Sequence, residues 1–448
     1  MPDLLQRLGA RERKIRDPLY GYIWLSKKEM AIVDSPLFQR LRRVHQLALT
    51  KYVYPSAEHT RFVHSLGVMH CATQMFRGIL ANSADRLDVS DHDQQTWLSK
   101  LRLAALLHDI GHLPFSHAAE EVLLQGINHE DISRYIIQHD PCISSFIQEI
   151  CDINPSHVAN ILSKNAMAKH LLLHDIVSGQ LDADRSDYLL RDSYACGVKY
   201  GEYDFVRYMN AFGCTMDNAA GTLFIKERDI PVIESFLLAR YHYNMQVPYH
   251  RTRVGYDITL RKYFETLDVA SIMQPILTIN NNEITEFNPE AFEEFDDYDV
   301  FQDIKRSRRT CRWAAMLLRK EHLVAVLDTN DCESANSDFF KKYVAALADA
   351  GFKEDADFFP YEQNIVVSKF HLRDAAEDVE DTEPSDSDKK DLFVIDRDNV
   401  VKDVCQSSPI IKQLGKALLL LRVYVLPEKA DAAKDILKKV QSEATITN

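Results

Sequence analysis

The chain has 448 residues, of which 46% are hydrophobic, 10% aromatic and 27% charged. These proportions are those of ordinary globular proteins, so they exclude collagen-like, fibrous and globally disordered chains. The formal net charge of −14 at pH 7 does not indicate a nucleic-acid partner, because proteins that coat long nucleic acid usually carry a basic surface. A small polyanion needs only a local cluster of Arg and Lys, so the charge leaves such a ligand open.

The usage of glycine and cysteine bounds the fold and the compartment. Only 14 residues are glycine, which favours helices over glycine-punctuated β folds. The eight cysteines are scattered without a CxxC pair, which disfavours a zinc site made of thiolates. No apolar stretch approaches the roughly 20 residues that span a bilayer, and no apolar signal-peptide stretch stands at the start. We therefore predict a cytoplasmic protein with reduced thiols and no membrane partner.

Hydrophobic periodicity predicts a helical region that runs to about residue 270. Residues 14–25 contain Asp17-Pro18 and Gly21 between apolar stretches and predict a short hairpin. The pattern becomes helical from Lys27, and Pro36 follows a cap at Asp34 or Ser35. Apolar residues recur every three or four positions, which predicts a helix, in the segments 62–81, 94–108, 117–125, 130–139, 167–177 and 182–194.

The character of the sequence changes after residue 320. Strands are predicted at 322–328, 364–372, 391–396 and 418–426, and helices at 336–351 and 407–418. This order, β-α-β-β-α-β, is typical of a split βαβ module. The acidic segment 374–391 predicts a solvated loop. We therefore predict a helical catalytic domain with its hairpin at 1–270, a helical connection at 271–320 and a C-terminal α+β module at 321–448.

The densest chemical signal is the segment LRLAALLHDIGHLPFSHAAEE, residues 101–121. Its apolar helical stretch ends in the pair His108-Asp109. A single His on an apolar helix is most often a packed core residue, but two adjacent strong ligands in an apolar setting are costly unless they pair or bind a metal. Further donors are His64 upstream and, on one predicted helix downstream, Asp182, Asp184, Asp187 and Asp192.

These donors suggest a site for a divalent cation. One upstream imidazole, the His-Asp pair and one downstream Asp offer two nitrogen and two oxygen ligands. Such a set leaves coordination positions for water and substrate oxygens, as a catalytic site requires. The ligand types suit Mn, Fe, Mg, Ni or Zn, and their spacing does not choose among these metals.

Five ordered blocks give the chain a resemblance to a known family. They are DSPLFQRLRRVHQL (34–47), HTRFVHSLGV (59–68), ALLHDIGHLPFSH (105–117), NHED (128–131) and LDADRSDYLLRD (181–192), with weaker matches at 236–253 and 422–427. The chain resembles the HD-domain metal phosphohydrolases, and more closely the deoxynucleoside triphosphate triphosphohydrolases that include the SAM- and HD-domain-containing enzymes. The resemblance spans most of the chain. It implies a mainly α fold, in which an HD-domain helical phosphohydrolase core carries a smaller C-terminal α+β module.

The resemblance also implies roles for individual residues. It makes His64, His108, Asp109 and Asp184 the metal ligands, and His129 a catalytic histidine assisted by His117 and His112. Histidine suits this role because its unperturbed pKa lies near working pH. The residues that it places at the substrate are Gln46, Leu47, Arg61, Arg185, Tyr188, Asp192, Arg240, Tyr249 and Arg251. The plainer alternatives are core packing for the tyrosine Tyr188 and a solvated or ion-paired state for each arginine.

Two positions depart from the family pattern. Arg185 stands where a close relative has a lysine, and Pro248 stands where the family often has a tyrosine, although Tyr249 is adjacent. The second departure bears on selectivity for deoxyribose. The resemblance further implies an effector site for a second nucleotide at Asp34, Gln39, Arg42 and Arg207, while the same DSPLFQRLR segment is also a well-capped helix start.

We predict a metal-dependent enzyme that hydrolyses dNTPs to deoxynucleosides and inorganic tripolyphosphate. Relatives imply GTP, dGTP or a dNTP as the effector, and a homo-oligomer, dimer or tetramer, as the assembly. Two alternatives stay open. One is another HD phosphohydrolase, such as a nucleotidase, a phosphodiesterase or an alarmone hydrolase. The other is a nucleotide-sensing or nucleic-acid-binding regulator, which salt-dependent binding without turnover would favour.

Overall fold

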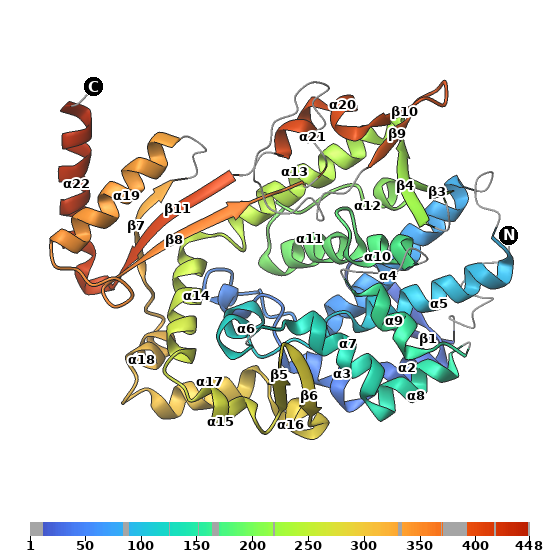
Figure 1. Cartoon of the computed structure of the whole chain (residues 1–448), viewed down its shortest axis with the longest axis horizontal. Helices are drawn as coiled ribbons and strands as arrows, with labels where there is room; N and C mark the ends of the chain where they lie inside the picture. The colour runs from blue at the N-terminus through green and yellow to red at the C-terminus, as the bar shows by residue number, and fades with distance from the viewer. Residues whose placement is uncertain are drawn as a thin grey trace.

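The fold is described from a computed structural model of the chain, in residues 12–83, 89–124, 126–150, 152–163, 170–217, 220–329, 334–368, 370, 392–415 and 418–446. The predicted mainly α class is confirmed: helices make up most of the described chain, and small sheets lie beside them (Figure 1). Among the described helices, none has the length and apolar character needed to cross a membrane.

The helical body is built around α4 (Arg61–Asn82) and α5 (Asp91–Leu107), which pack against each other. The predicted hairpin is confirmed as β1 (Arg13–Asp17) and β2 (Gly21–Leu25). Apolar side chains of all these elements belong to one continuous core. The other helices of this body are α2 (Lys27–Val33), α3 (Pro36–Arg40), α6 (His117–Leu123), α7 (His129–His139), α8 (Pro141–Glu149), α9 (Pro155–Ile161), α10 (Leu171–Ser178), α11 (Ala183–Cys196), α12 (Phe205–Met209), α13 (Ile230–Gln246) and α14 (Arg251–Phe264).

Local capping chemistry sets the ends of the helices that carry the candidate site. Ser90 accepts a hydrogen bond from the Asp93 amide at the start of α5, and Asn128 forms a capping box with Asp131 at the start of α7. Asp182 caps α11, which ends at Gly197 with a φ of 70°. A left-handed residue just past a helix is the usual place for glycine. The chain therefore fixes locally where these three helices begin.

A four-stranded sheet corrects the prediction of a purely helical region up to residue 270. β3 (Phe212–Asp217) and β4 (Ala220–Lys226) form an antiparallel pair. β9 (Phe393–Ile395) pairs with β4 in parallel, and β10 (Val401–Asp403) pairs with β9, which gives the order β10-β9-β4-β3. The prediction of one split βαβ sheet after residue 320 is wrong, because β9 and β10 belong to this sheet of the helical body. Two short helices follow, α20 (Val404–Ser407) and α21 (Pro409–Leu414).

The C-terminal sheet has three antiparallel strands in the order β7-β11-β8. They are β7 (Val324–Thr329), β8 (Phe358–Ile365) and β11 (Leu418–Val425), and α19 (Ser334–Asp349) and α22 (Ala430–Ile446) cover one face. Alternate side chains of β11 serve the two faces: Val423 packs toward α19 and α22, and Tyr424 packs toward α14 and α18 (Arg312–Arg319). The strand predicted at 364–372 overlaps β8 only at residues 364 and 365, because β8 lies earlier, and residues 369, 371 and 372 lie outside the described chain. The acidic segment 374–391 lies outside the described residues.

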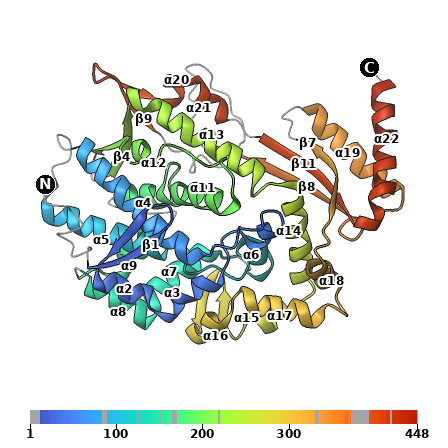
Figure 2. The same cartoon turned by 180° about the vertical axis from the view of Figure 1, so that it is seen from behind.

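The predicted helical connection contains a second hairpin as well as helices. In chain order it holds α15 (Val269–Met273), β5 (Leu277–Asn280), β6 (Glu283–Phe287), α16 (Pro289–Glu294), α17 (Asp297–Ser307) and α18. Seen from behind, this segment runs along the lower side of the molecule below α14 (Figure 2). The junction of α16 and α17 also reaches inward, because Phe295 accepts two hydrogen bonds from the fully buried Arg40. The domain boundaries themselves stay a prediction.

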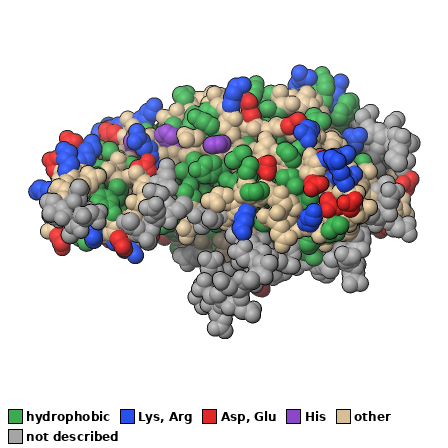
Figure 3. Space-filling view, turned by 90° about the horizontal axis from the view of Figure 1, so that it is seen from above, with side chains coloured by type: hydrophobic (Ala, Val, Ile, Leu, Met, Phe, Trp, Pro, Cys, Tyr) green, Lys and Arg blue, Asp and Glu red, His purple; other side chains and the backbone are tan. Residues whose placement is uncertain are grey.

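The face seen from above carries basic and acidic side chains side by side, with apolar side chains between them (Figure 3). This face therefore does not present a continuous field of one sign.

Candidate active site

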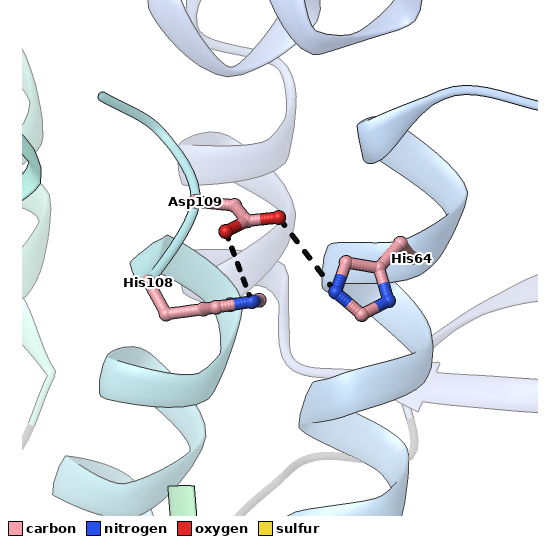
Figure 4. A group of neighbouring side chains, drawn as sticks. All are labelled: His64, His108 and Asp109. Carbon is pink, nitrogen blue, oxygen red and sulfur yellow. Dashed lines mark ion pairs between the residues drawn. The ribbon is translucent and has the colours of Figure 1, made fainter. Parts of the chain in front are cut away.

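The structure brings the four predicted metal ligands together, and Figure 4 shows three of them, His64, His108 and Asp109. His64 lies on α4, His108 and Asp109 directly follow the end of α5, and Asp184 lies in the first turn of α11. The two oxygens of Asp109 lie 3.3 Å from His108 Nε2 and 3.6 Å from His64 Nε2. Asp184 Oδ1 lies 3.0 Å from His64 Nε2 and 3.8 Å from His108 Nε2. His64, His108 and Asp109 form a group that could hold a metal ion.

The hydrogen bonds of the two histidines fit such an ion. His108 Nδ1 donates to the Ala105 carbonyl at 2.8 Å, so its Nε2 carries the lone pair. That Nε2 is buried and has no hydrogen-bond partner among the described residues. His64 Nδ1 lies 2.9 Å from Asp187 Oδ2, which turns its Nε2 toward Asp109 and Asp184. A divalent cation is the partner that these nitrogens and carboxylates together would accept.

In the protein without a bound cation, the carboxylates determine the protonation of the histidines in the site. Burial alone would lower the pKa of His64, but its hydrogen bonds with Asp184 and Asp187 raise that pKa to about 10. Burial would raise the pKa of Asp109, but Arg61 and two neighbouring histidines hold it well below the usual 3.8. A cation that binds here therefore replaces a proton on His64, which makes metal binding pH-dependent.

A buried network behind His64 fixes its orientation. Arg191 bonds both oxygens of Asp187 at 2.8 and 2.9 Å and also pairs with Asp17 at 2.9 Å. The Tyr20 hydroxyl donates to Asp187 at 2.8 Å. Gly67, one turn after His64, leaves room for this carboxylate, because a Cβ there would lie 1.9 Å from Asp187 Oδ1. The glycine of the HSLG motif is therefore required by a close approach of two helices.

A second histidine pair lies beside Asp109. His112 and His129 are stacked with ring centroids 3.6 Å apart, and each Nδ1 contacts one oxygen of Glu120, at 2.5 and 2.9 Å. Burial and the neighbouring His112 lower the pKa of His129 below 6.5. Its Nδ1–H faces a carboxylate, so Nε2 is the nitrogen that can take up or hand over a proton. Sequence reasoning missed Glu120, and the side chain of His117 lies outside the described residues.

A cavity of about 260 Å³ adjoins this centre. Six of the predicted substrate residues line it: Gln46, Leu47, Arg61, Tyr188, Asp192 and Tyr249. The side-chain oxygen of Gln46 is buried and lacks a hydrogen-bond partner within the described chain. Asp192 already accepts from His59 Nε2 at 2.8 Å and from the Tyr243 hydroxyl. Pro248 also lines the cavity, together with seven residues that were not predicted: Ala48, Phe115, Ser116, Ala118, Tyr243, Asn244 and Arg253.

The predicted arginines differ in their surroundings. Arg61 bonds Asp109 Oδ2 at 2.5 Å and Ser116 Oγ at 2.8 Å. Arg185 pairs with Asp182 instead of lining the cavity. Arg240 is buried, and its Nε and Nη1 have no hydrogen-bond partner among the residues described. Arg251 is exposed and does not line the cavity, whereas Arg253, two residues later, does.

The predicted effector residues fall into two places. Asp34, Gln39 and Arg42 lie close in the chain at the α2–α3 turn, where Gln39 accepts from Arg42 Nε at 2.8 Å and Arg42 covers the Phe62 ring. Arg207 lies on α12, which packs against α13 and α4. Within the described chain, Arg207 forms no hydrogen bond, ion pair or ring contact with the other three residues, so the effector site stays a prediction.

Comparison with known proteins places this centre in a recognised domain. Residues 61–192, from the start of α4 to Asp192 on α11, match the HD domain family. The chain therefore contains an HD domain, and this segment carries all four predicted metal ligands as well as His112, His117 and His129.

Relatives of the chain are found among proteins and solved structures. It is 33% identical over 254 residues to the protein YwfO of Bacillus subtilis, covering 56% of this chain and 55% of that protein. It is 30% identical over 234 residues to the deoxynucleoside triphosphate triphosphohydrolase SAMHD1 of Homo sapiens, covering 46% and 36%. The chain spans about half the length of the first curated relatives it matches.

Two solved structures resemble nearly the whole chain. A hypothetical protein from Aquifex aeolicus superposes with a TM-score of 0.74 at 25% identity, covering 95% of this chain and 99% of that one. A phosphohydrolase from Bacteroides thetaiotaomicron superposes with a TM-score of 0.66 at 25% identity, covering 92% and 99%. The similarity thus extends beyond the HD domain to the C-terminal sheet.

Proposed function

We propose that the protein is a metal-dependent phosphohydrolase that converts dNTPs into deoxynucleosides and inorganic tripolyphosphate. The observation that carries this proposal is the cluster of His64, His108, Asp109 and Asp184, in which the buried His108 Nε2 lacks a hydrogen-bond partner within the described chain. Arg61 joins this set to the cavity, because it bonds Asp109 and lines the cavity wall. The HD domain supports the phosphohydrolase class, and the similarity to SAMHD1 supports the substrate.

Different side chains would bind the cation, the phosphates and the sugar. A divalent cation held by the four ligands supplies Lewis-acid polarisation of a phosphoryl oxygen. Arg61 and Arg240 bind phosphate oxygens and offset their charge, and Arg suits this because its planar fork matches phosphate. Gln46 accepts a hydrogen bond from the sugar, through an oxygen that lacks a partner in the described residues.

His129 is placed as the proton relay. Water attacks the α-phosphorus, the bond to the 5′-oxygen breaks, and that oxygen takes a proton as the deoxynucleoside leaves. The pKa of His129 is lowered by burial in the absence of substrate. The negative charges of a bound triphosphate favour the protonated imidazole, so substrate binding itself would load His129 with the proton that it delivers. Glu120 holds the ring through Nδ1 at 2.9 Å.

Two further proposals concern partners. We propose that a second nucleotide, GTP, dGTP or a dNTP, acts as effector at Asp34, Gln39, Arg42 and Arg207, and that the active assembly is a homo-oligomer. The exposed position of Asp34, Arg42 and Arg207 supports accessibility to a ligand or a second copy.

Analysis of the reaction products tests the proposed function. The protein, purified and loaded with Mg or Mn, is incubated with each dNTP, singly and mixed, with and without GTP, and the products are separated by anion exchange. We expect tripolyphosphate and deoxynucleoside in equal amounts, and loss of both with EDTA or in His108→Ala and Asp109→Ala. Glu149→Gln, which removes an exposed carboxylate on α8, serves as the control and should keep full activity.

The alternative functions give different products. Pyrophosphate or a linear monophosphate would indicate another phosphohydrolase, and no consumption of any nucleotide would favour a nucleotide-sensing regulator. Tripolyphosphate produced at the wild-type rate by both His108→Ala and Asp109→Ala would contradict the assigned metal site.

A further inference from the structure

Asp297 is a buried carboxylate outside the HD domain that holds two separate segments of the cavity wall. It is the first residue of α17 and is 0% exposed. Its Oδ2 accepts from the His45 amide at 2.9 Å and contacts His45 Nδ1 at 2.6 Å. Its Oδ1 accepts from the Phe115 amide at 2.8 Å. The side chain of Asp297 thus joins His45 to Phe115, two residues that are 70 positions apart in the sequence.

The two segments that Asp297 joins both form the cavity. Gln46 and Leu47 follow His45 directly, and Phe115 and Ser116 stand at the other contact; all four line the cavity. His45 also pairs with Thr60 in an isolated β-bridge, next to Arg61. Asp297 therefore contacts the two segments of the cavity wall that flank Arg61.

The Phe115–Ser116 turn needs such support. Both residues are in the left-handed region, with φ of 57° and 52°, which is unfavourable for residues other than glycine and persists only when surrounding contacts hold it. Ser116 Oγ accepts from Arg61 Nε at 2.8 Å, and Arg61 in turn bonds Asp109. The chain of contacts from Asp297 through Phe115 and Ser116 ends at the arginine that faces the phosphates in the proposed reaction.

We propose that Asp297 is a positioning residue for the cavity: it holds the Phe115–Ser116 turn and thereby aims Arg61. The expected effect of Asp297 on substrate affinity rests on the proposed function. Its expected effect on the order of the Phe115–Ser116 turn does not. Within the described chain, the hydrogen bonds of Asp297 go to His45 and Phe115 rather than to the metal ligands or His129. Loss of its carboxylate should therefore change substrate affinity more than it changes metal content.

Asp297→Asn tests the proposal with little change of shape. The amide can accept from Phe115 or from His45, but its NH₂ group cannot replace the second carboxylate oxygen as an acceptor. We expect faster hydrogen exchange of the amides of 113–116 and a KM for dNTP raised about tenfold, with kcat within about threefold and metal content unchanged. Asp299→Asn, which removes the capping-box carboxylate two residues later on the same helix, is the matched control and should change neither exchange of the turn nor KM.

Two outcomes would overturn the proposal: unchanged exchange at 113–116 in a folded Asp297→Asn, or equal changes in Asp299→Asn. If Asp297→Asn does not fold, Ser116→Ala tests the last contact, and an unchanged KM there would overturn the aiming of Arg61. If the wild-type protein hydrolyses no dNTP, the proposed function fails while the exchange measurement still decides whether Asp297 holds the turn.

Discussion

Arg240 is a buried arginine to which the proposed function assigns phosphate binding, although it is not among the residues that line the cavity. Its guanidinium is buried, two of its nitrogens lack hydrogen-bond partners within the described residues, and burial together with the neighbouring Arg185 lowers its pKa. A buried charge without adequate pairing is unfavourable, and an apolar side chain of similar size is often better tolerated. We therefore expect Arg240→Met to raise the free energy of unfolding by about 1 kcal/mol and to raise KM for dNTP at least about tenfold. Urea unfolding and steady-state kinetics measure the two effects.

Arg102 is the matched control for this prediction. It is buried too, but it bonds both oxygens of Glu29, at 2.7 and 2.9 Å, and Thr73. Removal of one partner leaves a buried carboxylate without its cation, so Arg102→Met should destabilise the protein by about 3 kcal/mol without a change in KM. If Arg240→Met also destabilised the protein, the prediction would be wrong, and the charge of Arg240 would be compensated in the folded protein by groups other than its hydrogen-bond partners.

At the scale of elements, His70 links α4 to two neighbours and makes their packing pH-dependent. Its ring stacks on Tyr20 of the β1–β2 turn at 4.6 Å and lies 6.4 Å from Phe205 of α12. Burial, and then the charge of Arg102, lower its pKa from 6.5 to about 4. The folded protein thus binds a proton at His70 less readily than the unfolded chain does. This contribution to stability is complete above pH 6.5, falls as the pH decreases from 6.5 to about 4, and amounts to about 3 kcal/mol in total.

His70→Phe keeps an aromatic ring but cannot be protonated. We expect the difference in unfolding free energy between the variant and the wild type to shift in favour of the variant between pH 6.5 and 4, and to stay constant from pH 7 to 8. Urea titrations at a series of pH values give this difference directly. A difference that is independent of pH would mean that His70 is hydrated in the folded protein.

Helices of the body were predictable where the sequence has its own apolar periodicity, and α5, α7 and α11 also have side-chain caps. The prediction of 62–81 corresponds to α4 at 61–82, and that of 130–139 to α7 at 129–139. The strands were harder to predict, because their pairing is non-local. β9 pairs with β4 across more than 160 residues, and the sequence of 391–396 does not indicate which strand it pairs with. β8 was misplaced because Pro360 argues against a strand; β8 lies at the edge of its sheet, where proline is tolerated.

The candidate site was predictable only where its residues stand in motifs. His64, His108, Asp109 and Asp184 stand in the blocks that carry the resemblance, and the structure brings them together. Glu120, Arg253 and Asp297 do not differ in sequence from ordinary surface residues. Glu120 contacts histidines eight and nine positions away, whereas Arg253 and Asp297 meet segments that are distant in the sequence. Acidic and basic residues of this kind are recognised only after the fold places their partners.

At the scale of the whole molecule, the C-terminal sheet supports the cavity of the helical body through one strand. Arg422 of β11 is 3% exposed; its Nε bonds Asp328 of β7 at 2.6 Å, and its Nη1 bonds the Tyr249 carbonyl at 2.6 Å. The neighbouring Tyr424 hydroxyl donates to the Arg251 carbonyl at 2.9 Å. Tyr249 and Arg253 line the cavity. The strand thus holds the segment that leads into α14, and the sheet is part of the cavity's support.

Substitutions of the two partners of the Arg422–Asp328 ion pair test separately the stability of the sheet and its direct contact with the cavity wall. Arg422→Leu removes both bonds, so the Tyr249 carbonyl loses its donor and we expect KM for dNTP to rise about tenfold, the value of one charged hydrogen bond. Asp328→Asn weakens the bond within the sheet but leaves the Arg422–Tyr249 bond, so KM should stay within about twofold while the unfolding free energy falls by about 1 kcal/mol. Steady-state kinetics and thermal unfolding of both variants measure this. An equal rise of KM in the two variants would show that the sheet affects the cavity through overall stability. A rise only in Arg422→Leu requires the direct contact, because both variants disturb the bond between β7 and β11 but only Arg422→Leu removes the bond to the Tyr249 carbonyl.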